Sequence, residues 1–152
     1  GVFDGDAVER LFTNRLDLTE HPYYAQLDGL KVSAHFFVRR DGQLIQFVPC
    51  LKRAWHAGES SWQGVSRCND YSIGIELEGS DALPFTDGQY ATLVRLTAAL
   101  RAVYPIRGIA GHSAWKLAGR LRAAGIVVDV AAGAAYFSNF FMLLFRRIEV
   151  IS

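Results

Sequence analysis

Two apolar runs on either side of the dipeptide Asp41-Gly42 constrain this chain more than any other feature of its sequence. The runs lie between Lys31 and Pro49 and are rich in Phe, Val and Ile. Asp-Gly tolerates positive φ at both central positions of a tight turn, a geometry that joins two antiparallel strands directly. We therefore predict a hairpin with a two-residue turn, in which the cross-strand pairs are Arg40 with Gln43, Val38 with Ile45, and Phe36 with Phe47.

This hairpin register predicts which side chains are buried. One face carries an apolar set that needs a partner layer, namely Ala34, Phe36, Val38, Ile45 and Phe47. His35 and Phe37 point to the opposite face. A histidine in a strand is more often a hydrogen-bonded structural residue than a catalyst, so both roles stay open for His35.

A further strand is predicted over Ser72–Glu78, because apolar and polar residues alternate there. The apolar face carries Ile73, Ile75 and Leu77. The polar face carries Ser72, Gly74, Glu76 and Glu78. Gly74 beside Glu76 leaves a gap at which another group can approach closely. The polar face is either a solvated acidic surface or part of a site. The preceding loop, which begins at Arg53 and mixes aromatic with polar residues, favours a binding surface.

Helical periodicity occurs in three segments of the chain. Short helices are predicted over Gly5–Phe12 and Tyr23–Leu27. The main helix begins at Thr86, whose spacing to Gln89 fits a capping box, and it ends before Tyr104-Pro105.

The apolar run Gly108–Gly111 is predicted to be one more strand, with His112 at its end, where ligands often bind in α/β sheets. His112 could equally cap a following helix. Together the elements predict a single-domain α/β fold with a central mixed β-sheet flanked by helices. The expected sheet contains Val32–Val38, Gln43–Val48 and Ser72–Glu78, and the helix Asp87–Val103 covers the face that holds Phe36, Val38, Ile45 and Phe47.

Composition supports one compact domain, since 152 residues with 51% hydrophobic and 20% charged residues can bury a sizeable core. A net charge of +1 without a basic run gives no indication of a nucleic-acid partner. Cys50 and Cys68 are too few for a disulfide framework and lack metal-site spacing, which fits a reducing compartment.

The C-terminal part differs in character. Val130–Phe145 is an uncharged run of 16 residues followed by Arg146-Arg147. It is shorter than the roughly 18–20 apolar residues of a membrane span, so a buried tail is favoured over a membrane contact.

Residues 1–113 resemble the zinc amidases of the AmpD type, which are cytoplasmic 1,6-anhydro-N-acetylmuramyl-L-alanine amidases of cell-wall recycling with the fold of T7 lysozyme and the peptidoglycan-recognition proteins. The resemblance rests on segments that occur in order, among them His21-Pro22-Tyr23-Tyr24, Val32-Ser33-Ala34-His35, Lys52 to Gly58, Cys68-Asn69-Asp70, Ser72 to Gly79 and Gly111-His112-Ser113.

The resemblance implies hydrolysis of the amide between muramic acid and L-alanine of the stem peptide, with one zinc ion. It implies that His112 is a zinc ligand, that Glu76 activates the attacking water, and that Arg67 binds a substrate carboxylate through its bidentate fork. The expected substrate-binding residues are Trp55, His56, Arg67, Lys31 and His35. The expected partner is an anhydro-muropeptide or a peptidoglycan fragment, and we expect a cytoplasmic monomer.

The chain also departs from the family pattern. The family's first zinc ligand is a His on an N-terminal strand, and this chain begins after that point. Arg120 and Arg122 stand where a catalytic Lys and a zinc-binding Asp are expected, and a guanidinium cannot ligate zinc. We therefore expect an incomplete amidase-like domain over residues 1–113, a divergent tail over 114–152, and impaired activity. A non-catalytic muropeptide-binding module and an inactive truncated homologue are the alternatives.

Overall fold

A computed structural model of the chain describes residues 5–79, 83–111 and 145–151. Along the chain, the helices and strands are α1 (Ala7–Phe12), the 3₁₀ helix η1 (Pro22–Leu27), β1 (Phe36–Val38), β2 (Leu44–Gln46), β3 (Ser61–Trp62), β4 (Val65–Ser66), the 3₁₀ helix η2 (Cys68–Asp70), β5 (Ser72–Glu78), α2 (Asp87–Val103), β6 (Gly108–Gly111) and β7 (Phe145–Ile151).

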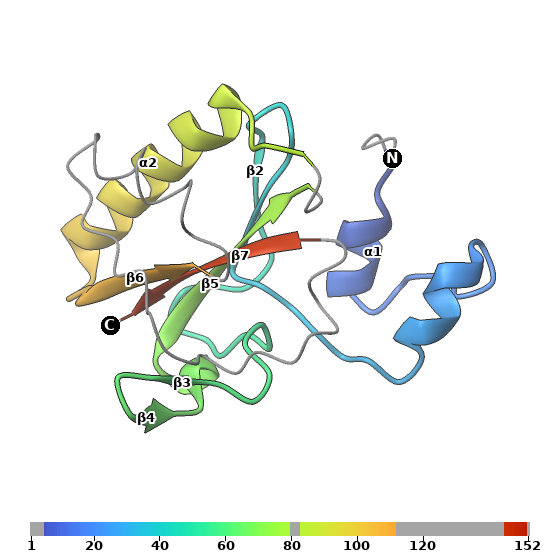
Figure 1. Cartoon of the computed structure of the whole chain (residues 1–152), viewed down its shortest axis with the longest axis horizontal. Helices are drawn as coiled ribbons and strands as arrows, with labels where there is room; N and C mark the ends of the chain where they lie inside the picture. The colour runs from blue at the N-terminus through green and yellow to red at the C-terminus, as the bar shows by residue number, and fades with distance from the viewer. Residues whose placement is uncertain (1–4, 80–82, 112–144, 152) are drawn as a thin grey trace.

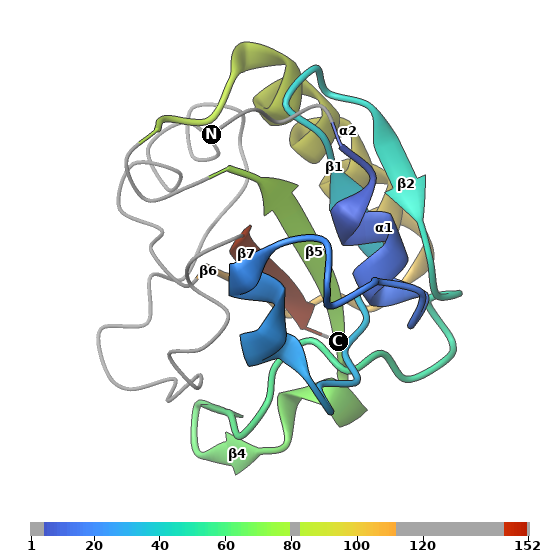
Figure 2. The same ribbon diagram turned by 90° about the vertical axis from the view of Figure 1, so that its right-hand side faces the viewer.

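A five-stranded sheet with the order β2-β1-β5-β7-β6 forms the centre of the molecule (Figure 1). β1 is parallel to β5, whereas the β1–β2, β5–β7 and β6–β7 pairs are antiparallel. Helix α2 lies to one side of this sheet and α1 to the other (Figures 1 and 2). The predicted mixed α/β fold with flanking helices is confirmed, and so is the common sheet of the three predicted strands.

Helix α2 and the apolar face of β5 make the main core. The helix has the predicted bounds and the predicted capping box, because the Thr86 hydroxyl accepts a hydrogen bond from the Gln89 amide while the Gln89 side chain accepts one from the Thr86 amide. Its buried stripe packs on alternate residues of the sheet. The central members of this core are Phe36, Val38, Ile73, Ile75, Leu77, Leu93, Leu96 and Leu100.

The hairpin register differs from the prediction by one residue. Phe37 rather than Val38 lies opposite Ile45, and the Arg39 amide donates to the Gln43 carbonyl at 2.9 Å. The turn therefore contains three residues, Arg40 to Gly42, and the Gly42 amide closes it on the Arg39 carbonyl. Gly42 has φ +90°, which is the left-handed residue that this longer turn requires. Asp-Gly serves either turn type, so the dipeptide alone did not decide the register.

This shift overturns the predicted common face. Ile45 and Phe47 pack in a second cluster with Phe37, while Phe36 and Val38 face α2. Ala34 also belongs to the second cluster. A register change of one residue exchanges the faces of a strand, and β1 is buried on both faces, so its alternation carried no clear signal.

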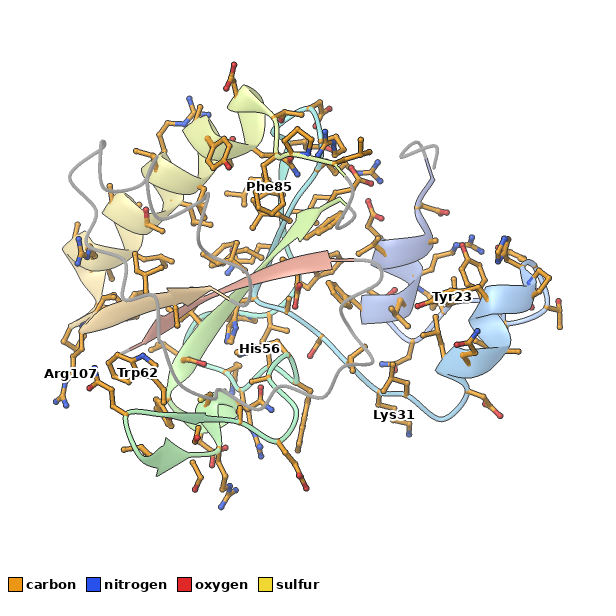
Figure 3. The ribbon with its side chains drawn as sticks, in the orientation of Figure 1. Tyr23, Lys31, His56, Trp62, Phe85 and Arg107 are labelled. Carbon is orange, nitrogen blue, oxygen red and sulfur yellow. The ribbon has the colours of Figure 1, made fainter. Side chains whose placement is uncertain are left out.

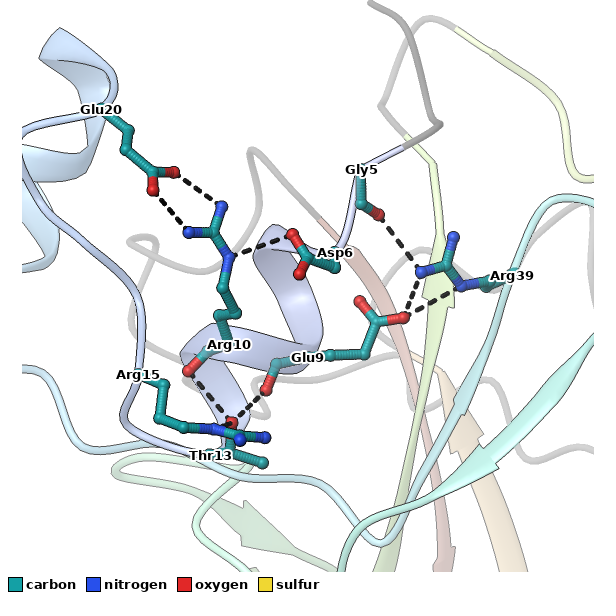
Figure 4. A network of polar contacts seen from close by, with 8 residues as sticks. All are labelled: Gly5, Asp6, Glu9, Arg10, Thr13, Arg15, Glu20 and Arg39. Carbon is teal, nitrogen blue, oxygen red and sulfur yellow. Dashed lines mark hydrogen bonds and ion pairs between the residues drawn. The ribbon is translucent and has the colours of Figure 1, made fainter.

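The second cluster fills the side of the sheet opposite α2. It is closed by Leu11 and Phe12 of α1 and by Leu27 of η1. Polar contacts hold α1 there (Figure 4): the Arg39 guanidinium pairs with Glu9 and also donates to the Gly5 carbonyl at 3.2 Å. The N-terminal segment is thus fastened to the end of β1.

Strand β7 comes from the segment that we expected to be a divergent tail, and no strand was predicted there. It pairs with β5 along its whole length and with β6 on its other side. β5 therefore has a neighbouring strand on both edges. Within the described residues, α2 is the longest helix, and no helix combines the length and the apolar character needed to cross a bilayer.

Candidate functional site

The polar face of β5 is buried rather than solvated. All seven residues of the strand are buried, and Glu76 is only 1% exposed. The register aligns Glu76 with Phe37, and Phe37 belongs to the cluster under α1. Neighbouring residues in register point to the same side of a sheet. The carboxyl-bearing face of β5 thus lies on the side away from α2.

His56 occupies the gap that Gly74 leaves in this face. A Cβ atom added at Gly74 would lie 2.3 Å from His56 Cγ, so the ring rests directly on the strand backbone. Figure 3 shows His56 beside the sheet, above the β3–β4 hairpin. Because Glu76 is two residues after Gly74, its side chain leaves the strand on the same face as the His56 ring. The close approach predicted at Gly74 is therefore occupied by the protein's own histidine.

His35 links the segment before the Trp55 loop to the β5 backbone through both of its ring nitrogens. Its Nε2 lies 2.8 Å from the Lys52 carbonyl oxygen, and its Nδ1 accepts a hydrogen bond from the Gly74 amide at 3.0 Å. These partners assign the proton to Nε2. Burial lowers the pKa of His35, which keeps the ring neutral. Both nitrogens are engaged inside the protein, so the geometry favours the structural alternative over the expected contact with substrate.

The loop that carries Trp55 and His56 is held by two other segments. The Trp55 amide donates to the Ser33 hydroxyl at 3.1 Å, and the Ser33 amide donates to the Trp55 carbonyl at 3.0 Å. The buried Asn69 side chain accepts hydrogen bonds from the amides of His56 and Ala57 at 3.0 and 2.8 Å. Asn69 belongs to η2, which leads into β5, so the strand and the loop are positioned together.

An exposed guanidinium pair adjoins this loop. Arg53 Nε lies 3.0 Å from Asp70 Oδ1, and Arg67 Nε lies 2.9 Å from Asp70 Oδ2. The Arg53 guanidinium also stacks on the Trp55 ring, with Cζ 3.9 Å from the ring centroid. Trp55 and Arg67, both predicted site residues, are brought together here through Arg53 and Asp70.

The remaining predicted site residues are more separate. Lys31 is exposed on the extended segment after η1, two residues before Ser33 (Figure 3). His112 follows β6 in the chain and lies outside the described residues. The expected groove shared by Glu76 and His112 thus stays a prediction.

Sequence reasoning missed Ser33, Arg53, Asn69 and Asp70 as members of the site. Asn69 and Asp70 lie in the short turn that leads, through Tyr71, into a strand that is buried on both faces, and polar residues at such a position were the available signal. Ser33 and Arg53 carried no local signal, because their roles depend on partners far along the chain.

A possible metal centre was tested on these residues. Among those described, no group of three His, Cys, Asp or Glu side chains could hold a metal ion. His35 offers no nitrogen, since both are used by Gly74 and Lys52. The described residues by themselves do not fit a catalytic zinc ion, which needs three protein ligands.

Comparison with known proteins identifies one family, in agreement with the resemblance found in the sequence. Residues 6–123 match the family model described as N-acetylmuramoyl-L-alanine amidase. The chain is 53% identical over 114 residues to 1,6-anhydro-N-acetylmuramyl-L-alanine amidase AmpD of Citrobacter freundii, a match that covers 74% of this chain and 61% of that protein. It is 51% identical to AmpD of Escherichia coli strain K12, covering 74% and 62%, respectively.

A solved structure has the same arrangement. The crystal structure of a selenomethionine AmpD derivative matches with a TM-score of 0.67 and 55% identity, over 69% of this chain and 59% of that one. The chain thus spans about three fifths of the length of these relatives.

Proposed function

The chain belongs to the N-acetylmuramoyl-L-alanine amidase family, and from this membership we propose that it binds anhydro-muropeptides. The bond at issue is the amide between N-acetylmuramic acid and L-alanine, which the AmpD relatives carry in their name. The observation that carries the proposal is the buried polar face of β5, which bears Glu76 and on which the His56 ring of the Trp55 loop packs at Gly74.

We assign the proton-transfer role to Glu76. A carboxylate on the same face as the His56 ring can accept the proton of an attacking water and return it to the leaving amine. Trp55 offers an exposed aromatic surface for the sugar or the peptide, and Arg67 offers a fork of donors for a carboxylate. We also propose Lys31 as a contact for an anionic group of the ligand, through its single positive charge.

Zinc is the cofactor that the family resemblance implies, and His112 is the ligand it implies in this sequence. The described residues do not complete such a site, and Arg120 and Arg122 cannot ligate a metal ion. We therefore propose that the polypeptide of residues 1–152, by itself, binds muropeptide but hydrolyses it poorly. A muropeptide-binding module without turnover is the second candidate. It is favoured because the described residues contain no group of three side chains that could hold a zinc ion.

The setting that we propose is cytoplasmic cell-wall recycling by a monomer. The relatives are named for a 1,6-anhydro-N-acetylmuramyl substrate, and the Cys50 and Cys68 thiols fit a reducing compartment. The net charge of +1 gives no support for a nucleic-acid partner.

The test combines binding and turnover. Residues 1–152 are titrated calorimetrically with anhydro-N-acetylmuramyl-L-alanyl-D-glutamate, and peptide release is measured by mass spectrometry with added Zn²⁺, beside the E. coli relative. Binding with turnover far below that of the relative is expected, and Glu76→Gln should remove the residual turnover. Turnover equal to the relative's would overturn the impairment alone, whereas no binding would overturn the function.

A further inference from the structure

Two arginines from different loops share one aspartate on the exposed side of the site. Arg53 lies at the start of the loop that carries Trp55 and Arg67 precedes η2, yet their Nε atoms contact different oxygens of Asp70 at 3.0 and 2.9 Å. The three side chains are partly solvated, with exposed fractions of 37% for Arg53, 71% for Arg67 and 35% for Asp70.

Hydrogen-bond donors outnumber acceptors in this cluster. Each guanidinium has five N–H donors, whereas one carboxylate has two oxygens and about four lone-pair sites. Asp70 accepts from both Nε groups, with one carboxylate oxygen contacting each arginine. The cluster keeps a net charge of +1 and surplus donors, which is the chemistry that a second carboxylate, supplied by a ligand, would satisfy.

The surrounding contacts preorganise the pair. Arg53 is stacked on Trp55, whose amide and carbonyl are both bonded to Ser33. Arg67 has φ 66° and ψ 53°, a left-handed conformation that is uncommon for a residue with a side chain. Asp70 belongs to η2 and is held next to β5.

We propose that Arg53 is a second guanidinium of the carboxylate-binding surface, next to Arg67, and that Asp70 is the positioning residue that sets their spacing. The ligand group is a carboxylate of the muropeptide stem peptide, so this inference rests on the proposed function. Trp55 then orients Arg53 by stacking, and the pair selects stem peptides that bear a free carboxylate over those in which it is an amide.

The test uses two matched ligands, anhydro-N-acetylmuramyl-L-alanyl-D-glutamate and its diamide, in which both carboxylates are carboxamides. Each is titrated into residues 1–152 by calorimetry, and mass spectrometry verifies that the ligand is recovered intact. The measured quantity is the ratio of the two affinities, which does not depend on the fraction of protein that is folded. In the unaltered chain the diacid should bind about tenfold more tightly than the diamide, as expected for partly solvated charged hydrogen bonds.

Arg53→Gln should reduce this ratio severalfold, with Arg67 supplying what remains, and Arg53→Lys should recover only part of the loss, because an ammonium lacks the planar fork. Arg101→Gln is the matched control, since it removes an exposed arginine of α2, which packs on the other side of the sheet, and it should leave the ratio unchanged. A ratio unaffected by Arg53→Gln would overturn the role of Arg53.

Asp70→Asn separates positioning from simple charge. The substitution raises the net charge of the cluster from +1 to +2, so electrostatics alone predicts tighter binding of the diacid. Positioning predicts weaker binding and a lower ratio, because the guanidinium groups lose their common anchor. Tighter binding would overturn the positioning role. If the unaltered chain binds both ligands equally, Arg53 and Arg67 do not form a carboxylate-binding surface, and the proposed function stands. If it binds neither ligand, the proposed function itself fails.

Discussion

The two faces of β5 are built by different means. The apolar face buries Ile73, Ile75 and Leu77 against one helix that follows in the chain. The polar face is filled by His35 and His56, which come from two separate earlier segments. The first face is held by non-directional burial of area, and the second by hydrogen bonds and close fit. We therefore expect damage to the first to lower global stability, and damage to the second to alter the site.

The largest effect is expected from Leu93→Ala in α2, on the apolar side. Leu93 is fully buried, so its truncation should cost about 2–5 kcal/mol of unfolding free energy. Chemical denaturation measures this loss. Arg101→Ala on the same helix is exposed and should change stability by less than about 0.5 kcal/mol. A loss of muropeptide affinity per folded molecule in Leu93→Ala would break the distinction between the faces.

Gly74→Ala is the matching test on the polar side. The added methyl would meet the His56 ring, which we expect to cost about 1–3 kcal/mol and to lower muropeptide affinity as well. Gly5→Ala is the control, because the nearest atom to its added Cβ is 3.9 Å away. If the clash is with His56, the double variant Gly74→Ala/His56→Ala should be more stable than the sum of its single effects implies. Strict additivity would contradict the close fit.

Asn69→Ala tests whether the hydrogen bonds from Asn69 hold the loop that carries Trp55 and His56. It leaves the amides of His56 and Ala57 without their acceptor, and a loss of about 1–2 kcal/mol is expected. Asn69→Asp keeps an oxygen at the same position and should retain more of both stability and affinity. Equal losses in the two variants would show that packing, rather than hydrogen bonding, holds the loop.

The smallest effect is a pH dependence of the polar face. Burial lowers the pKa of His35, and the neighbouring His56 ring, 5.5 Å away between centroids, acts in the same direction. Below about pH 6.5 the unfolded chain binds a proton that the folded chain resists. Stability should therefore fall with decreasing pH, by no more than about 1.4 kcal/mol per pH unit. In His35→Gln this part of the slope should disappear; an unchanged slope would assign it to other groups.

Local pattern predicted the parts of the fold that depend on neighbouring residues. The bounds of α2 follow from its capping box and its stripe, and the strand Ser72–Glu78 follows from its alternation. The hairpin was predicted but its register was wrong, since Asp41-Gly42 fits both a two-residue and a three-residue turn. β7 was not predicted, because its place between β5 and β6 depends on pairing with strands far earlier in the chain.

The sequence by itself determined the fold class, the apolar face of β5 and the likeness to the amidase family, which was predicted over residues 1–113 and is matched by the family model over residues 6–123. It also identified Gly74 as a point of close approach. Only the tertiary structure decided that His56 fills that point, that His35 uses both ring nitrogens internally, and that Arg53 and Arg67 meet at Asp70. The reason is physical: helix caps and strand alternation act over two to four residues, whereas His35 and Gly74 are 39 residues apart and Trp55 and Ser33 are 22 apart.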